Sequence, residues 1–239
     1  MEQHHILLLG ATGGSGLAFI DAVLELPQKP ALTLYVRASS KSKIPASATG
    51  KAGIRMVEGE LNDGQALRIA LSASNDPSFS PVSAVISFLG AYLSLQAVFT
   101  RDKSHPIADA LANSILPTMK SCGVSRILAL STPTAFCLPA ERKSMPWKWW
   151  FYTWIPLLLA PQANAEMKAI ADTVIKVGSK DEGLEWTMFR VPHLTDGDRK
   201  AEVIAGNLDQ AFKGSTARWV LTELQERHWI CRAPMLGNA

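Results

Sequence analysis

The stretch Ile6-Leu-Leu-Leu-Gly10-Ala-Thr-Gly-Gly-Ser-Gly16-Leu17 joins a short apolar run to a glycine-rich turn. The run Ile6–Leu9 has no polar residue, which is typical of a strand buried on both faces of a sheet. The next segment, Leu17–Leu26, carries apolar side chains at helical spacing and stops before Pro27. The stretch therefore predicts a strand, a tight turn and a helix in immediate succession.

Apolar runs and helical segments continue to alternate along the chain. Continuous apolar strands separated by helices indicate a parallel sheet covered on both faces. We therefore expect an α/β fold with a doubly wound parallel sheet of the Rossmann type, formed by a single domain over residues 1–239. The further strands are predicted at Ala31–Val36, Ile54–Val57, Val82–Phe88, Arg126–Leu130 and Leu184–Arg190, and the further helices at Pro106–Ser121 and Gln162–Val177.

The glycines of the turn have separate tasks in this interpretation. Gly10 lets the chain turn sharply after the strand, Gly13 lets the backbone approach a pyrophosphate, and Gly16 lets the helix pack closely on the sheet. The helix N-terminus presents N–H groups and a partial positive charge to an anion. The spacing G-x-x-G-x-x-G between a strand and a helix predicts dinucleotide binding, and the alternative is a glycine-rich turn without a ligand.

The end of the second predicted strand indicates which dinucleotide is bound. A site that selects NAD usually has an acidic residue there, which holds the ribose 2′-hydroxyl. This chain instead reads Val36-Arg37-Ala-Ser39-Ser40-Lys41, with no carboxylate. A guanidinium at this position can pair with a 2′-phosphate. The segment therefore predicts NADP(H), and the alternative is a solvated basic loop.

The segment Met145–Pro161 departs from the alternating pattern. It contains four of the seven tryptophans together with Pro156 and Lys148. It is too short and too interrupted to span a membrane. We consider three interpretations: a helix or loop packed on the domain, an apolar lid or wall over the substrate pocket, or a dimer contact or membrane-surface face. In the second, this aromatic, lid-like insertion forms a small substrate-side subregion of the single domain.

Composition and charge exclude several classes of protein. A hydrophobic content of 47% supports a large core. The net charge of +3 comes from scattered residues, which form no basic patch of the kind that binds nucleic acid. The three cysteines show no zinc-ligand spacing, so we expect no metal site. The beginning of the chain has no features of a signal peptide, and we expect a cytoplasmic protein. A homo-oligomer is compatible with this composition.

Five motifs along the chain resemble those of one known group of proteins. They resemble the atypical short-chain dehydrogenase/reductase group of NAD(P)H-binding, NmrA-like proteins, over Ile6 to about Pro234. The resemblance implies contacts with NADP(H) along the carboxyl ends of the strands. The motifs are Gly10–Gly16, Val36-Arg37, Glu58–Asp63, Ser131-Thr132-Pro133 and Trp186–Pro192. The implied cofactor-binding residues are Gly10, Thr12, Gly13, Gly14, Ser15, Gly16, Arg37, Ser39, Lys41, Glu60, Leu61, Phe88, Leu89, Gly90, Ser131, Thr132, Lys168, Val191, Pro192 and His193.

The usual catalytic pair of short-chain dehydrogenases is missing from the sequence. These enzymes use Tyr-x-x-x-Lys, in which the lysine lowers the pKa of the tyrosine. None of the tyrosines, Tyr35, Tyr92 and Tyr152, has a lysine four positions later. The candidate substitutes are Ser131 beside the nicotinamide, Lys168 on its ribose, and Tyr152 as a proton donor. Tyr92 and His193 are further candidates for the proton donor.

Three functions follow from these observations. The first is an NADPH-dependent oxidoreductase acting on a fairly apolar carbonyl, enone or quinone-type molecule, such as a secondary metabolite. The second is a regulator or scaffold that binds NADP(H) without catalysis, which the missing tyrosine–lysine pair favours. The third is a non-redox isomerase or cyclase on the same fold, because fold alone does not determine function.

Overall fold

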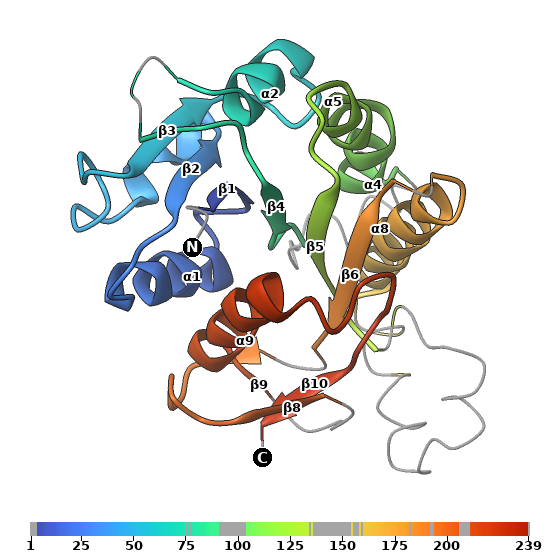
Figure 1. Ribbon diagram of the computed structural model, residues 1–239. Helices are drawn as coiled ribbons and strands as arrows, with labels where there is room; N and C mark the ends of the chain where they lie inside the picture. The colour runs from blue at the N-terminus through green and yellow to red at the C-terminus, as the bar shows by residue number, and fades with distance from the viewer. Residues whose placement is uncertain are drawn as a thin grey trace.

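Six parallel strands form the central sheet of the molecule (Figure 1). The computed structural model describes residues 4–74, 76, 78–90, 104–133, 135, 154, 158, 160–181, 183–191, 194–205 and 211–238. The strand order is β3-β2-β1-β4-β5-β6, so the direction of winding reverses between β1 and β4. This is the Rossmann order, and it confirms the predicted fold class. The strands are β1 (His5–Leu9), β2 (Ala31–Val36), β3 (Ile54–Glu58), β4 (Ala84–Ser87), β5 (Arg126–Ser131) and β6 (Glu185–Arg190).

Helices cover both faces of this sheet. Figure 1 shows α1 and α9 together on one face, and α2, α4, α5 and α8 on the other. No helix in the described part of the chain is long and apolar enough to cross a membrane. The helices are α1 (Gly14–Glu25), α2 (Gly64–Leu71), α4 (Pro106–Ala110), α5 (Leu116–Ser121), α8 (Pro161–Gly178) and α9 (Lys213–Glu226), with a 3₁₀ turn η1 (Ala38–Lys43) and a π-helical turn η2 (Leu111–Ile115).

The core lies between the sheet and these helices. Every residue of β1, β2, β4 and β5 is buried, as expected for strands covered on both faces. Phe88 packs between Phe19 of α1 and Phe189 of β6, with ring centroids 5.7 and 5.6 Å away. These rings connect α1 with β6 past the end of β4.

The C-terminal part of the chain adds short strands that the sequence did not predict. Residues 232–235 run beside β6, where the amides of Met188 and Arg190 donate to the carbonyls of Arg232 and Pro234. The buried guanidinium of Arg190 donates through Nε to the carbonyl of Ala233 at 2.8 Å. The added strands are β7 (Leu194–Thr195), β8 (Val203–Ala205), β9 (Ala211–Phe212) and β10 (Leu236–Asn238).

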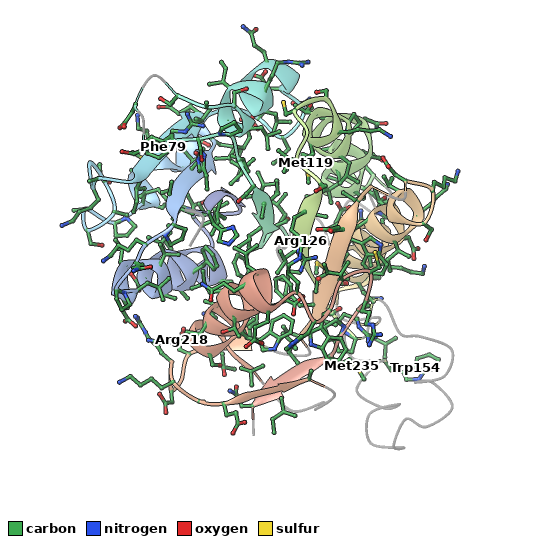
Figure 2. The ribbon with its side chains drawn as sticks, in the orientation of Figure 1. Phe79, Met119, Arg126, Trp154, Arg218 and Met235 are labelled. Atoms are coloured by element: carbon green, nitrogen blue, oxygen red, sulfur yellow. The ribbon has the colours of Figure 1, made fainter. Side chains whose placement is uncertain are left out.

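A buried ion pair joins α9 to the sheet. Arg126 at the start of β5 donates to Glu223 of α9 at 3.0 Å, and the two side chains are 3% and 2% exposed (Figure 2). Glu223 also accepts from the amides of His228 and Trp229, so its negative charge is well solvated by the protein. This pair fixes the position of α9, and α9 in turn lies along α1.

Loss of one member of the pair should destabilise the protein strongly. We expect Glu223→Gln to lower the free energy of unfolding by about 3–5 kcal/mol, because it leaves the Arg126 charge buried without a counter-ion. Urea unfolding measures this loss. The control is Lys120→Met, which breaks a pair with Asp181 whose lysine is 73% exposed, and it should cost less than about 1 kcal/mol. Equal losses in the two variants would contradict this role for Arg126 and Glu223.

His5 should make the stability depend on pH. Its buried ring contacts the carbonyl of Ser80 and lies 2.7 Å from Oγ1 of Thr33, and burial lowers its pKa below 6.5. The unfolded state therefore takes up the proton first as the pH falls. The urea midpoint should decline on acidification below about pH 6.5 and should decline less steeply in His5→Gln. The exposed His228 provides the control His228→Gln, which should keep the wild-type slope.

Candidate functional site

The glycine-rich turn lies at the carboxyl end of β1, beside the point where the winding of the sheet reverses. Gly10 has a φ of +78°, and a Cβ there would come 2.9 Å from the backbone of Phe88. A Cβ on Gly16 would lie 2.2 Å from the carbonyl oxygen of Gly10 and 2.8 Å from the Cα of Ala11. Only glycine fits at these two positions, so α1 begins in direct contact with the end of β1.

The beginning of α1 presents backbone N–H groups to this edge. The amide of Gly13 donates to Gly10 and that of Leu17 donates to Gly13. The amides of Gly14, Ser15 and Gly16 belong to the first turn, where a helix has no internal acceptor for them. Thr12 and Ser15 add half-buried hydroxyl groups. The arrangement is suited to an anion such as a diphosphate.

A basic segment follows β2 at the same edge. Arg37 and Ser39 are exposed, and the structure gives the Arg37 guanidinium no acidic partner among the residues it describes. Lys41 is already paired with Glu58 at the end of β3, with 2.6 Å between Nζ and Oε1. Of the two predicted cations, Arg37 is therefore the one that needs no change of partner to contact a phosphate. Lys41 would have to leave Glu58 before it could contact a phosphate.

The loop after β3 is held against β2. The hydroxyl of Tyr35 donates to the carbonyl of Glu60 at 2.8 Å, and a Cβ on Gly59 would come 2.2 Å from that hydroxyl oxygen. Burial, with smaller contributions from Asp63 and Glu60, raises the pKa of Tyr35 to about 12. The phenol is therefore a structural donor that stays neutral at ordinary pH. It positions Glu60 and Leu61, the residues expected beside the adenine.

Residues after β4 and β5 meet the start of α8. Phe88 is buried, whereas Leu89 and Gly90 are partly exposed at the strand end. Met167 lies against Gly90, with Sδ 3.4 Å from a Cβ built there. The buried hydroxyl of Ser131 donates to the carbonyl of Met167 at 3.4 Å. Thr132, the next residue, is partly exposed and accepts from the amide of Ala135.

Two residues of α8 that are two positions apart, Glu166 and Lys168, lie in opposite environments. Lys168 is exposed and forms an ion pair with Asp172 one turn later. Glu166 is buried and accepts from the amides of Ile107 and Ala108 at 2.8 and 3.0 Å, which caps α4. Its other oxygen lies 3.2 Å from Nδ1 of His105. The contacts of Glu166 are therefore structural. The predicted contact of Lys168 with a ribose stays a prediction.

Several predicted residues lie outside the described part of the chain. These are Tyr152, Tyr92, Pro192 and His193, and their roles stay predictions. Val191 is buried, and its amide donates to the carbonyl of Ser131 at 3.0 Å. Of the segment Met145–Pro161 the structure describes Trp154, Leu158, Ala160 and Pro161; Trp154 and Leu158 are exposed (Figure 2). The lid therefore also stays a prediction.

Lys213, the first residue of α9, is a neighbour of the turn that sequence reasoning missed. Its Nζ lies 3.2 Å from the position of a Cβ on Gly14, and it pairs with Asp196 at 3.0 Å. About two hundred residues separate Lys213 from the turn, and no local spacing relates them. The contact results from the packing of α9 along α1.

These observations fit a dinucleotide. Because Gly10 and Gly16 have no Cβ, the turn brings the start of α1 against the end of β1, where it offers backbone donors for a diphosphate. The exposed Arg37 lies where the chain leaves β2, and the loop after β3 is fixed by Tyr35. All these groups are at the carboxyl ends of parallel strands around the switch point, which is where open α/β sheets bind ligands.

Alanine in place of single glycines should test the tight packing at the turn. We expect Gly16→Ala to destabilise the fold by about 1–3 kcal/mol, because its methyl group would overlap backbone atoms of Gly10 and Ala11. It should also weaken NADPH binding. The matched control is Gly14→Ala, whose methyl group meets only the flexible Lys213 side chain. Thermal unfolding of both variants checks the packing argument, which equal losses of stability would contradict, and NADPH titration of Gly16→Ala checks its binding.

Comparisons with solved structures give the same fold. A short-chain dehydrogenase/reductase from Veillonella parvula DSM 2008 in complex with NADP has 17% identity, with coverage of 98% of this chain and 94% of that chain and a TM-score of 0.68. An oxidoreductase from Lactococcus lactis has 14% identity, coverage of 98% and 91%, and a TM-score of 0.69. ChuY, an anaerobillin reductase from Escherichia coli O157:H7, has 16% identity, coverage of 98% and 96%, and a TM-score of 0.65.

Sequence comparison identifies the family. Curated proteins give no significant match. A family model described as NAD(P)H-binding matches residues 10–224, which begin at the first glycine of the turn and end within α9. This match confirms the predicted dinucleotide cofactor and also the resemblance to NAD(P)H-binding proteins. The chain belongs to the NAD(P)H-binding family.

Proposed function

We propose that this protein is an NADP(H)-dependent oxidoreductase acting on a small, fairly apolar carbonyl, enone or quinone-type substrate. The observation that carries the choice of NADP(H) is Arg37, exposed and without a described acidic partner where the chain leaves β2. No carboxylate precedes Lys41 in this segment, so a ribose 2′-hydroxyl lacks its usual acceptor while a 2′-phosphate finds a guanidinium.

The chain's own residues divide the work of binding. The amides at the start of α1 hold the diphosphate, and Arg37 with Ser39 holds the 2′-phosphate. Leu61 and Glu60 border the adenine, and the strand ends at Leu89, Gly90 and Thr132 flank the nicotinamide. When bound, the nicotinamide supplies or accepts the hydride. The protein orients the two reactants and keeps water from them.

The hydroxyl groups of Ser131 and Thr132, at the end of β5, are the proposed contacts for the substrate oxygen. Ser131 is buried and engaged with Met167, whereas Thr132 is partly exposed at the same strand end. A hydroxyl in this position polarises a carbonyl through a hydrogen bond. The proton donor remains among the predicted candidates Tyr152, Tyr92 and His193, and the predicted lid at Met145–Pro161 suits an apolar substrate.

Reversal of charge at Arg37 should change coenzyme preference. We expect Arg37→Asp to raise the Kd for NADPH by about tenfold to a hundredfold, because it removes charge-assisted hydrogen bonds to the 2′-phosphate. The Kd for NADH should change by less than about threefold, since NADH lacks this phosphate. Lys43→Asp makes the same charge change at the far end of η1 and should leave the ratio of the two constants near the wild-type value. Equal losses for both coenzymes in Arg37→Asp would refute the assignment.

A turnover assay distinguishes the proposed oxidoreductase from its alternatives. We expect protein-dependent loss of NADPH absorbance with at least one member of a panel of quinones, flavins and enones. Tight NADPH binding without turnover on the panel would indicate a regulator or scaffold instead. Conversion of a substrate without net consumption of NADPH would indicate a non-redox isomerase or cyclase.

A further inference from the structure

Lys213 lies across the beginning of α1. Its Nζ and Cε atoms are each 3.2 Å, and its Cδ atom 3.4 Å, from the position of a Cβ on Gly14. Gly10 and Gly16 are required by nearby backbone atoms, but the space above Gly14 is filled by this side chain alone within 4 Å. The end of the lysine therefore rests directly on the first turn of the helix.

Two other cations from the C-terminal part of the chain also meet α1, and both have acidic partners there. Arg199 pairs with Asp21 at 3.1 Å, and Arg218, labelled in Figure 2, pairs with Glu25. Both acids belong to the second half of α1, whose carboxyl end carries a partial negative charge that favours cations. The folded chain therefore explains the positions of both arginines without a ligand.

Lys213 is placed at the opposite end of the same helix. The first turn, Gly14–Leu17, contains no acidic residue. A helix N-terminus carries a partial positive charge, so a cation there is disfavoured unless an anion lies between them. The dipole of α1 therefore does not favour Lys213 at this position, whereas a bound diphosphate would favour it.

Asp196 keeps Lys213 near the turn without holding it firmly. The two lie 3.0 Å apart, but Asp196 is 93% exposed whereas Lys213 is 28% exposed. An ion pair of this kind is screened by water and contributes little to stability, so its cation can change partner. The loop of Asp196 is fixed nearby, because Arg199 packs on Gly214, where a Cβ would come 2.6 Å from its Cγ.

We propose that Lys213 is a cofactor-binding residue whose ammonium group leaves Asp196 and pairs with the diphosphate at the beginning of α1. The inference rests on the proposed placement of the dinucleotide at this turn. The diphosphate is common to NADPH and NADH, so Lys213 contributes to the binding of both. Arg37, in contrast, distinguishes between them.

Titration of both coenzymes tests this role without measuring turnover. We expect Lys213→Met to raise the Kd for NADPH and for NADH by about tenfold each, because one charge-assisted contact is lost. The ratio of the two constants should stay at the wild-type value, and the remaining affinity should fall less steeply with salt. Arg218→Met is the matched control: it also removes a cation of α9 that meets α1, but away from the turn, and both Kd values should stay within about twofold of wild type.

Asp196→Asn provides a second variant that does not remove the lysine. It should lower both Kd values by about twofold to threefold, because Lys213 loses its competing anion. Circular dichroism establishes that each variant is folded, and if Lys213→Met is not, Asp196→Asn decides. Wild-type affinity in Lys213→Met, a loss confined to NADPH, or weaker binding in Asp196→Asn would each overturn the proposal. These titrations do not depend on turnover. If both coenzymes bind through Lys213 but the wild-type protein consumes no NADPH with the substrate panel, this inference holds and the proposed function fails. If NADPH is consumed but Lys213→Met binds as the wild type does, the proposed function holds and this inference fails.

Discussion

The contact between the first turn of α1 and the end of β1 is the constraint on which the site depends. With no side chain on Gly16, the helix starts in contact with the carbonyl of Gly10, and its amides face the carboxyl edge of the sheet. Every other element of the site is positioned relative to this point. The chain leaving β4 passes over Gly10, and the phenyl ring of Phe88 connects the turn to the core.

The charges around α1 accord with the helix dipole at its carboxyl end, and at its amino end they do so only when an anion is bound. Its amino end has no acidic residue and faces Lys213 and the predicted diphosphate position, while Asp21 and Glu25 toward its carboxyl end pair with arginines of the C-terminal part. The buried pair of Arg126 and Glu223 holds α9 in place. The C-terminal helix thus packs on the sheet and, in our proposal, also brings a cation to the cofactor.

Local sequence predicted the sheet and the turn well because both are set by short-range patterns. The strand Ala31–Val36 was predicted to the residue, and the others differ by one or two residues at their ends. The strands after β6 were missed because they are only two or three residues long and pair with one another, β7 with β9 and β8 with β10, so no alternating pattern marks them. Lys213 was missed for a related reason, since packing of α9 on α1 brings it to a turn far away in the sequence. The separate orientations of Glu166 and Lys168 were predictable, because helical spacing fixes them.

The most direct test of the account is a crystal structure of the complex with NADPH. The central claim is that NADP(H) binds across the carboxyl ends of β1 and β2, with its diphosphate at the beginning of α1. The account predicts a 2′-phosphate against Arg37 and a diphosphate between the amides of Gly14–Gly16 and the ammonium group of Lys213. A coenzyme whose diphosphate lies away from the turn, or whose 2′-phosphate points into solvent away from Arg37, would contradict it.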